Sequence, residues 1–329
     1  MQIRITKPGV LSTIQDMGRM QYLSQAVPVS GAMDTLSARI ANIAVGNAHD
    51  DAVIEFTYAA AEFVAESDIL IAYAGDGAVL KSGDNIIPTE RPVFIPQGSA
   101  VRLVNNPAGS RTYLAIACGW DILQILGSRS TYTTAGIGGH KGRALQAGDV
   151  LTSSQKCSGA TNNLLLKLQG QVINYPKWNI TRQALLPVDK KTIRVVPAHE
   201  FTWFDGCSIY DFLSSPYKLS MQSNRMGYHL DGVPIQRLVQ NELLSTAVTP
   251  GTIQVTGSGT PVLLMADCQT TGGYPRIAQV AAVDLPLCGQ LKPGDIIFFK
   301  ETSRHDAEML YIEREEHLYK LALAVQSQF

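Results

Sequence analysis

Short runs of β-branched, aromatic and aliphatic residues follow one another through this chain, and turn signals separate them. The runs lie at residues 2–6, 53–58, 63–65, 69–74, 79–81, 93–95, 100–105 and 112–117. Gly, Pro and Asn clusters between them predict turns, as at residues 82–84, 96–98 and 106–107. Runs this short at such regular spacing are typical of β-sandwiches and β-barrels. The pattern therefore predicts a mainly β protein.

Two segments instead have the spacing of a helix. In the first, Asp34 is placed to cap a helix whose apolar residues recur every three or four positions, and Gly46-Asn47 supplies the stop. In the second, residues 305–326 carry apolar side chains on one side and charges opposite, which predicts an amphipathic C-terminal helix.

The composition limits the classes of function. The 329 residues predict about two domains. Lys and Arg number 27 against 28 for Asp and Glu, and the pI is near 6.6, which argues against a nucleic-acid partner. Only 17% of residues are charged, below the typical ~25%, so an obligate subunit whose surface a partner covers is plausible.

The five cysteines are odd in number and far apart, and none has CxxC spacing. This pattern predicts reduced thiols in a cytoplasmic protein rather than a disulfide framework. The N-terminus alternates like a strand and lacks the apolar core of a signal peptide, and no apolar run approaches the ~20 residues that span a bilayer. We expect a soluble cytoplasmic chain with no membrane partner.

A small, polar segment at residues 153–163 predicts a linker between two similar halves. Residues 109–118 resemble residues 259–268, and a G-x-L-x-x-G-D-like turn recurs later in each half at nearly the same offset. These matches favour an internal duplication, with one β-barrel half at 1–155 and the other at 164–329. The alternative is that such turns and apolar strands recur by chance in any β protein.

Common catalytic motifs are missing from the sequence. There is no H-E-x-x-H, no paired CxxC and no G-x-S-x-G, and the six histidines are dispersed, so we predict no metal site. The glycine-rich run at 136–143 lacks the hydroxyl that follows Lys in a P-loop. Its His140, Lys141 and Arg143 suit an anion or a carboxylate, or they are solvated charges on a hairpin connection.

Three other stretches are rich in Gly, Arg and polar residues, which are uncommon in the core of a β protein. The first, residues 28–47, uses helical spacing to place Asp34, Ser37 and Asn42 near one another, with Glu55 following; alternatively Asp34 is only a cap. The second, residues 220–228, presents Arg225 to a carboxylate or carbonyl.

The third stretch, residues 267–276, combines two glycines with neutral hydrogen-bonding side chains. Gly272 and Gly273 let a ligand approach the backbone closely, while Gln269 and Tyr274 supply hydrogen bonds. The alternative is a tight hairpin in which Tyr274 only packs.

Together these stretches resemble a known family. The motifs S-G-x-M-D-x-x-S-x-R-x-A-N, G-G-x-x-G-R-x-L-x-x-G-D, S-x-R-M-G-Y and D-x-Q-T-T-G-G-Y-P occur in order between about residues 3 and 300. They are similar to the carboxyltransferase-domain family of C-type and D-type subunits, also called allophanate hydrolase subunit 2 or the Kip antagonist type. Its bacterial members include the C-type subunit of the ATP-hydrolysing 5-oxoprolinase.

The resemblance implies a fold of two tandem cyclophilin-like β-barrel halves with a few short helices and a C-terminal helix. It also implies two partners, the Kip inhibitor-like B-type subunit and the A-type subunit of 5-oxoprolinase, and the ATP-dependent opening of 5-oxoproline to glutamate by the complex. The chain alone is expected to be inactive, and the sequence leaves open which of the three chains binds ATP.

The motif positions and residue types then predict the site. We expect Arg225, Arg143, Asp267 and Tyr274 to act in catalysis. The residues expected to bind substrate are His140, Gln269, Asn42, Glu55, Gly272 and Gly273. Two alternatives stay open: a carboxyltransferase component of a biotin-dependent urea or amide carboxylase, or a non-enzymatic antagonist of a Kip inhibitor-like kinase regulator.

Overall fold

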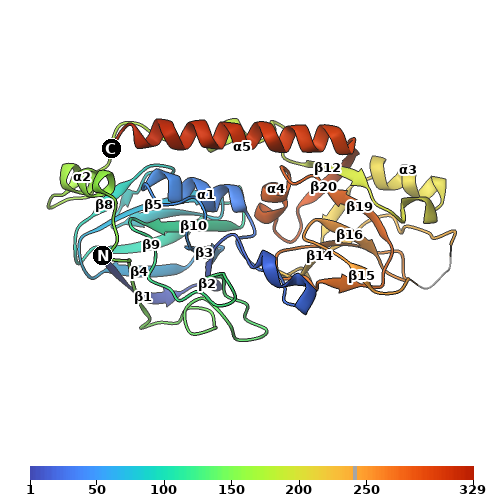
Figure 1. Cartoon of the computed structure of the whole chain (residues 1–329), viewed down its shortest axis with the longest axis horizontal. Helices are drawn as coiled ribbons and strands as arrows, with labels where there is room; N and C mark the ends of the chain where they lie inside the picture. Colours follow the sequence, from blue (N-terminus) through green and yellow to red (C-terminus); the bar gives the residue numbers. More distant parts are fainter. Residues whose placement is uncertain (240–242) are drawn as a thin grey trace. The chain divides into compact units, whose positions relative to one another are not determined.

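The computed structural model describes residues 1–239 and 243–329 (Figure 1). Strands account for 31% of the chain and helices for 22%, so the fold is mixed α/β and strand-rich rather than mainly β. Contacts divide the chain into two units. Unit 1 comprises Met1–Gly18, Asp34–Leu185 and His317–Phe329, and unit 2 comprises Arg19–Met33 and Leu186–Glu316. The expected boundaries at 155 and 164 stay a prediction about domains.

Unit 1 contains most of the strands that the N-terminal runs predict. Its elements are β1 (Gln2–Pro8), β2 (Leu11–Gln15), α1 (Thr35–Ala44), β3 (Val53–Thr57), β4 (Ala61–Ala65), β5 (Ile69–Gly75), β6 (Ala78–Ser82), β7 (Asn85–Ile86), β8 (Val93–Ile95), β9 (Ala100–Asn105), β10 (Arg111–Ile116), β11 (Val150–Thr152), α2 (Gly159–Leu168) and the 3₁₀ turn η2 (Arg182–Leu185).

Unit 2 contains a second set of strands and four helical segments. Its elements are η1 (Met20–Gln25), β12 (Thr192–Pro197), η3 (Phe201–Trp203), α3 (Gly206–Ser214), β13 (Tyr217–Leu219), β14 (Gly227–Asp231), β15 (Thr246–Ala247), β16 (Thr252–Val255), β17 (Pro261–Leu264), β18 (Thr271–Gly272), β19 (Arg276–Val280), α4 (Leu285–Gln290) and β20 (Ile296–Glu301). The C-terminal helix α5 (Arg304–Gln326) follows β20, and its residues from His317 onward belong to unit 1.

The strands of unit 1 form two antiparallel sheets, with the orders β11-β1-β4-β9-β6-β7 and β2-β3-β10-β5-β8. Both sheets contribute side chains to one core, including Ile3 and Phe63 from the first and Ile71 and Leu114 from the second. The expectation of a closed barrel is wrong for this unit, because two open sheets that share a core bury their apolar faces without closure.

Helix α1 matches its sequence prediction. The Asp34 carboxylate accepts a hydrogen bond from the Ser37 amide at 2.9 Å, which satisfies a donor at the helix start. The helix contacts β5 and β10, and its apolar residues Leu36, Ile40 and Ile43 are buried. Figure 1 shows it over these strands.

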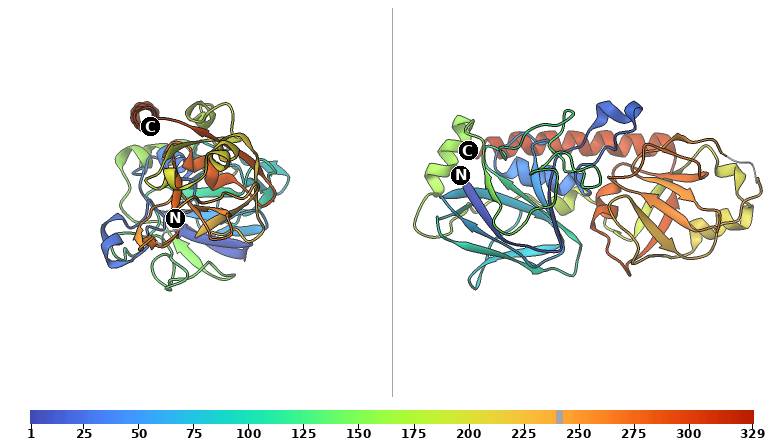
Figure 2. Two further views of the ribbon diagram at one scale, coloured as in Figure 1. Left: turned by 90° about the vertical axis from the view of Figure 1, so that its right-hand side faces the viewer. Right: turned by 90° about the horizontal axis from the view of Figure 1, so that it is seen from below.

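The strands of unit 2 close into a barrel, which confirms the prediction for this half. The order is β12-β19-β16-β17-β14-β13-β20, and only the β12–β20 pair is parallel. Its core includes Ile193, Tyr217, Ile253, Leu263 and Phe299. The curvature of these strands can be followed in the right-hand view of Figure 2.

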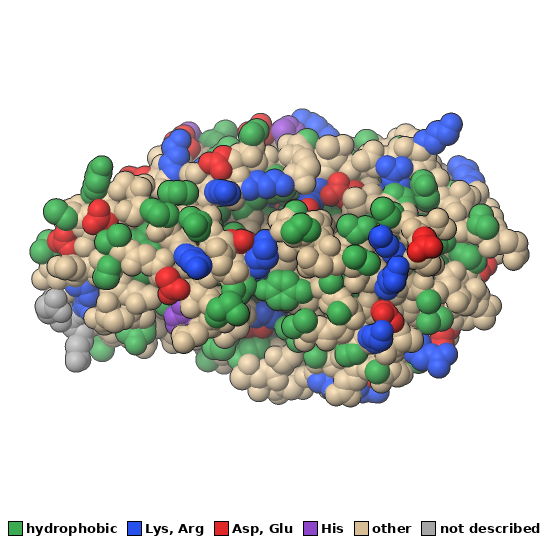
Figure 3. Space-filling model, turned by 180° about the vertical axis from the view of Figure 1, so that it is seen from behind, with side chains coloured by type: hydrophobic (Ala, Val, Ile, Leu, Met, Phe, Trp, Pro, Cys, Tyr) green, Lys and Arg blue, Asp and Glu red, His purple; other side chains and the backbone are tan. Residues whose placement is uncertain are grey.

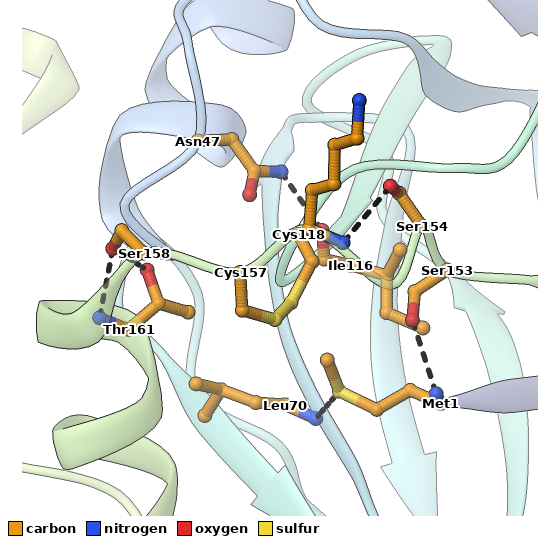
Figure 4. The surroundings of a disulfide bond; sticks show 11 residues. Met1, Asn47, Leu70, Ile116, Cys118, Ser153, Ser154, Cys157, Ser158 and Thr161 are labelled. Carbon is orange, nitrogen blue, oxygen red and sulfur yellow. Dashed lines mark hydrogen bonds between the residues drawn. A yellow bond between two sulfur atoms is a disulfide. The ribbon is translucent and has the colours of Figure 1, made fainter.

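Two expectations about the segment after β10 are wrong. Cys118 and Cys157 form a disulfide, with Cα atoms 4.7 Å apart, instead of the reduced thiols that the cysteine pattern predicts (Figure 4). The residues lie 39 positions apart, and sequence spacing alone gives no sign that the fold brings them together. The predicted linker also contains the first turn of α2, because the Ser158 hydroxyl accepts from the Thr161 amide and caps a leucine-rich segment.

The described residues include no helix long and apolar enough to cross a bilayer. On the face shown in Figure 3, acidic and basic side chains are interspersed, and no patch of one sign stands out. This surface agrees with the near-neutral net charge.

Candidate functional site

An ion pair joins two of the predicted site residues in unit 2. Arg225 precedes β14 and Asp267 follows β17, and these strands pair antiparallel with Gly227 opposite Leu264. The start of one strand therefore lies beside the end of the other. Arg225 Nε lies 2.7 Å from Asp267 Oδ2 and Nη2 lies 3.1 Å from Oδ1, so the contact is bidentate.

The Arg225–Asp267 pair is buried. The exposed fraction is 9% for Arg225 and 5% for Asp267. Arg225 Nη2 also donates to the Gly31 carbonyl at 2.7 Å, which fixes the S-G-A-M-D segment against β14. Because the carboxylate neutralises the guanidinium, the pair carries no net charge that would attract an anion.

The segment after Asp267 packs against Gln254 of β16. The buried Gln254 amide donates to the Tyr274 carbonyl at 3.0 Å, and its Oε1 lies 3.4 Å from Gln269 Nε2. A Cβ on Gly272 would come 2.6 Å from Gln254 Nε2, so a larger residue here would force the Gln254 side chain to move. The Tyr274 side chain is 51% exposed, and Gln269 is exposed as well. These two side chains are accessible to a ligand.

The basic side chains of the glycine-rich loop in unit 1 surround one carboxylate, that of Asp149. Arg143 donates to both oxygens of Asp149, at 2.7 and 2.8 Å, and these contacts hold the pKa of Asp149 well below its usual value. His140 Nε2 lies 3.3 Å from the same carboxylate, outside hydrogen-bond geometry. Burial lowers the pKa of His140, and the nearby carboxylate only partly offsets this effect. This shift favours the neutral form of His140.

Asn42 and Glu55 lie inside unit 1. The Asn42 amide donates to the Asp51 carbonyl at 2.7 Å and accepts from Asn47, so it closes the turn after α1 rather than joining Asp34. Glu55 is 1% exposed and accepts from the Tyr113 hydroxyl at 2.8 Å.

The structure therefore groups the predicted residues by unit. Six of the predicted residues belong to unit 2: Arg225, Asp267, Gln269, Gly272, Gly273 and Tyr274. The other four belong to unit 1: His140, Arg143, Asn42 and Glu55. Among residues 1–239 and 243–329, no cluster of three or more His, Cys, Asp or Glu side chains is arranged to hold a metal ion. An apolar cavity of about 580 Å³ in unit 2, lined by Val280, Leu285 and Ile312, contains none of the predicted residues.

Sequence reasoning misses three residues that shape these sites. Gln254 lies in an apolar strand, and nothing in its local sequence marks it as a partner of residues 269–274. Asp149 stands out in the sequence only as part of a turn motif. Glu200 binds Arg276 through two hydrogen bonds of 2.6 and 2.7 Å, and only the fold brings these residues together.

Comparison with known proteins identifies the family. The family model described as "Carboxyltransferase domain, subdomain A and B" matches residues 25–301. This chain belongs to the carboxyltransferase-domain family. Its motif-bearing stretches, from the S-G-A-M-D segment to β20, all fall within the matched residues.

The carboxyltransferase-domain chain has relatives of two kinds. It is 33% identical to the C-type subunit of 5-oxoprolinase from Escherichia coli over 320 residues, which is 97% of each chain. It is 32% identical to the urea amidolyase of Saccharomyces cerevisiae over 326 residues, covering 94% of this chain and 17% of that protein.

A solved structure has a similar fold. The Kluyveromyces lactis urea amidolyase superposes on 97% of this carboxyltransferase-domain chain with a TM-score of 0.85 at 28% identity, using 20% of its own length. The chain is thus similar along its whole length to one part of a much larger enzyme.

Proposed function

We propose that the chain is the C-type subunit of an ATP-dependent 5-oxoprolinase. The observation that carries this proposal is the end-to-end match with the C-type subunit of the E. coli enzyme, which covers 97% of both chains. In the proposed complex with the A-type and B-type subunits, 5-oxo-L-proline, ATP and two water molecules give L-glutamate, ADP and phosphate. ATP is bound by the complex, and it is not assigned to this chain.

The proposed substrate site lies in unit 2, around the Arg225–Asp267 pair and residues 269–274. Gln269 and Tyr274 are accessible and can hydrogen-bond a lactam, while Gly272 and Gly273 allow close approach to the backbone. In this proposal Arg225 and Asp267 shape the site, because each neutralises the other. His140, Arg143, Asn42 and Glu55 belong to unit 1, and their part in substrate binding or catalysis is a separate prediction.

Reconstitution tests the proposal. The chain is mixed with candidate A-type and B-type subunits, and glutamate formation from 5-oxoproline is measured with and without ATP. Arg225→Ala and Arg143→Ala are then assayed in the same complex. Unchanged rates with intact assembly would remove these two residues from the site.

The second candidate is the carboxyltransferase component of a biotin-dependent urea or amide carboxylase. The structural similarity to K. lactis urea amidolyase favours it. This function requires a biotinylated carrier protein, so avidin would abolish activity. A 5-oxoprolinase would be insensitive to avidin, and the same assay separates the two candidates.

A further inference from the structure

Two buried serine hydroxyls near the Arg225–Asp267 pair make no hydrogen bond. Ser30 is 3% exposed, and its Oγ has no hydrogen-bond partner among the described residues. The Oγ of Ser223 is also buried and has no partner within residues 1–239 and 243–329, although the residue as a whole is partly exposed. A buried hydroxyl without a partner costs free energy, so native proteins seldom leave one without a hydrogen-bond partner, whether protein, water or ligand.

Both serines are tied to the same guanidinium through the backbone. Ser30 directly precedes Gly31, whose carbonyl accepts from Arg225 Nη2 at 2.7 Å. Ser223 lies two residues before Arg225, in the turn where the Ser223 amide donates to the Ser220 carbonyl. All of these residues belong to unit 2.

The backbone at Ser30 is strained as well. Its φ angle is +55°, in the left-handed region that side-chain-bearing residues seldom adopt, and Gly31 follows with φ of +88°. Strain of this kind persists where the surrounding contacts enforce it, and it is concentrated at ligand-binding positions. Here the Gly31–Arg225 hydrogen bond holds the strained turn in place.

We infer that Ser30 and Ser223 form hydrogen bonds to a neutral amide or lactam group bound beside the Arg225–Asp267 pair. A hydroxyl both donates and accepts, so two of them match the carbonyl oxygen and the N–H of such a group. The ion pair has no net charge to hold an anion, which favours a neutral group over a carboxylate. This inference rests on the proposed function and names the part of the substrate that these residues contact.

The test combines ligand affinity with protein stability. Affinities of the complex for 5-oxo-L-proline and for 2-pyrrolidinone, a lactam without a carboxylate, are measured for the wild type, Ser30→Ala and Ser223→Ala. We expect each variant to bind both probes about tenfold more weakly, because each loses one hydrogen bond to the ligand. We also expect the Tm without ligand to stay unchanged or rise, because an unpaired polar atom has been removed.

Ser208→Ala is the matched control. Ser208 is also buried, at 5% exposure, but its hydroxyl donates to Asp205 at 2.7 Å and accepts from the Gln236 amide at 2.8 Å. This variant should lower the Tm and leave both affinities unchanged.

Three outcomes would overturn the inference. A lower Tm for Ser30→Ala and Ser223→Ala would show that the hydroxyls are structural. Unchanged affinities would remove both residues from the site while leaving the proposed function intact. A wild-type complex that makes no glutamate would refute the proposed function, and binding of urea is then measured as well. If the wild-type complex binds none of 5-oxo-L-proline, 2-pyrrolidinone and urea, the inference about the two serines is also overturned.

Discussion

Arg225 Nε and Asp267 Oδ2 lie 2.7 Å apart in an ion pair that is almost fully buried. A buried charge that loses its partner is expensive, whereas an exposed pair contributes little. The pair therefore links the stability of unit 2 to the geometry of the proposed substrate site.

Asp267→Asn should destabilise the protein by about 3–5 kcal/mol, because it leaves the Arg225 guanidinium buried without a counter-charge. The free energy of unfolding is measured by urea denaturation. Glu308→Gln is the control, since it removes an exposed partner of Arg304, and it should have no measurable effect. Equal stability of Asp267→Asn and the wild type would show that the ion pair does not support the fold.

The carboxylate of Asp149 should make stability depend on pH at acid values. Arg143 holds the folded-state pKa of Asp149 well below its ordinary value of 3.8. The unfolded state therefore binds the proton first, so the contribution is fully present above about pH 4 and is lost as the pH falls below 3.8. Melting temperatures between pH 2 and 7 should fall less steeply at the acid end for Asp149→Asn. An identical slope in both proteins would contradict this assignment.

Gly272→Ala should disturb the proposed site directly. The new Cβ would lie 2.6 Å from Gln254 Nε2, and the hydrogen bond from Gln254 to the Tyr274 carbonyl must break or lengthen. We expect a loss of about 1–3 kcal/mol in stability and a lower turnover in the complex. Gly257→Ala is the matched control, because a Cβ there meets nothing within 4 Å. A fully active and stable Gly272→Ala variant would show that this glycine is dispensable.

Counting free thiols tests the disulfide between Cys118 and Cys157. Unfolded without reductant, the protein should present three thiols, those of Cys207, Cys268 and Cys288, and with reductant it should present five. Replacing both Cys118 and Cys157 by Ser should cost about 2–4 kcal/mol, because the cross-link restricts the unfolded chain. Five thiols without reductant would show that the bond does not form.

These cysteines also illustrate what the sequence does not reveal. Helix α1 follows from the periodicity and the capping residue of its segment, and the C-terminal helix follows from its periodicity, so local pattern suffices to predict both. The Cys118–Cys157 bond and the Arg225–Asp267 pair join residues 39 and 42 positions apart, and only the tertiary fold brings them together.

Barrel closure is a second property that the sequence does not reveal. The short strand runs predict β structure in both halves, yet unit 1 forms two sheets and unit 2 a closed barrel. The difference lies in the pairing of β12 with β20, which joins the two ends of the strand order. Periodicity within a strand specifies which face is buried, but it does not specify the neighbouring strand.

Motif and residue type single out the candidate site residues, whose roles stay predictions, but they do not reveal the partners of these residues. Gln269 and Tyr274 are accessible to a ligand. The carboxylates that neutralise Arg225 and Arg143 change the proposed role of each arginine from attracting an anion to holding its own segment in shape. That distinction depends on distances between side chains, which the sequence does not contain.

The most direct test of the proposed function is glutamate formation by the reconstituted complex. The A-type and B-type subunits are assayed with 5-oxo-L-proline and ATP, with and without this chain. We predict glutamate and ADP in equal amounts only when all three chains are present. Glutamate formation at the same rate without this chain, or none with all three, would contradict the proposed function.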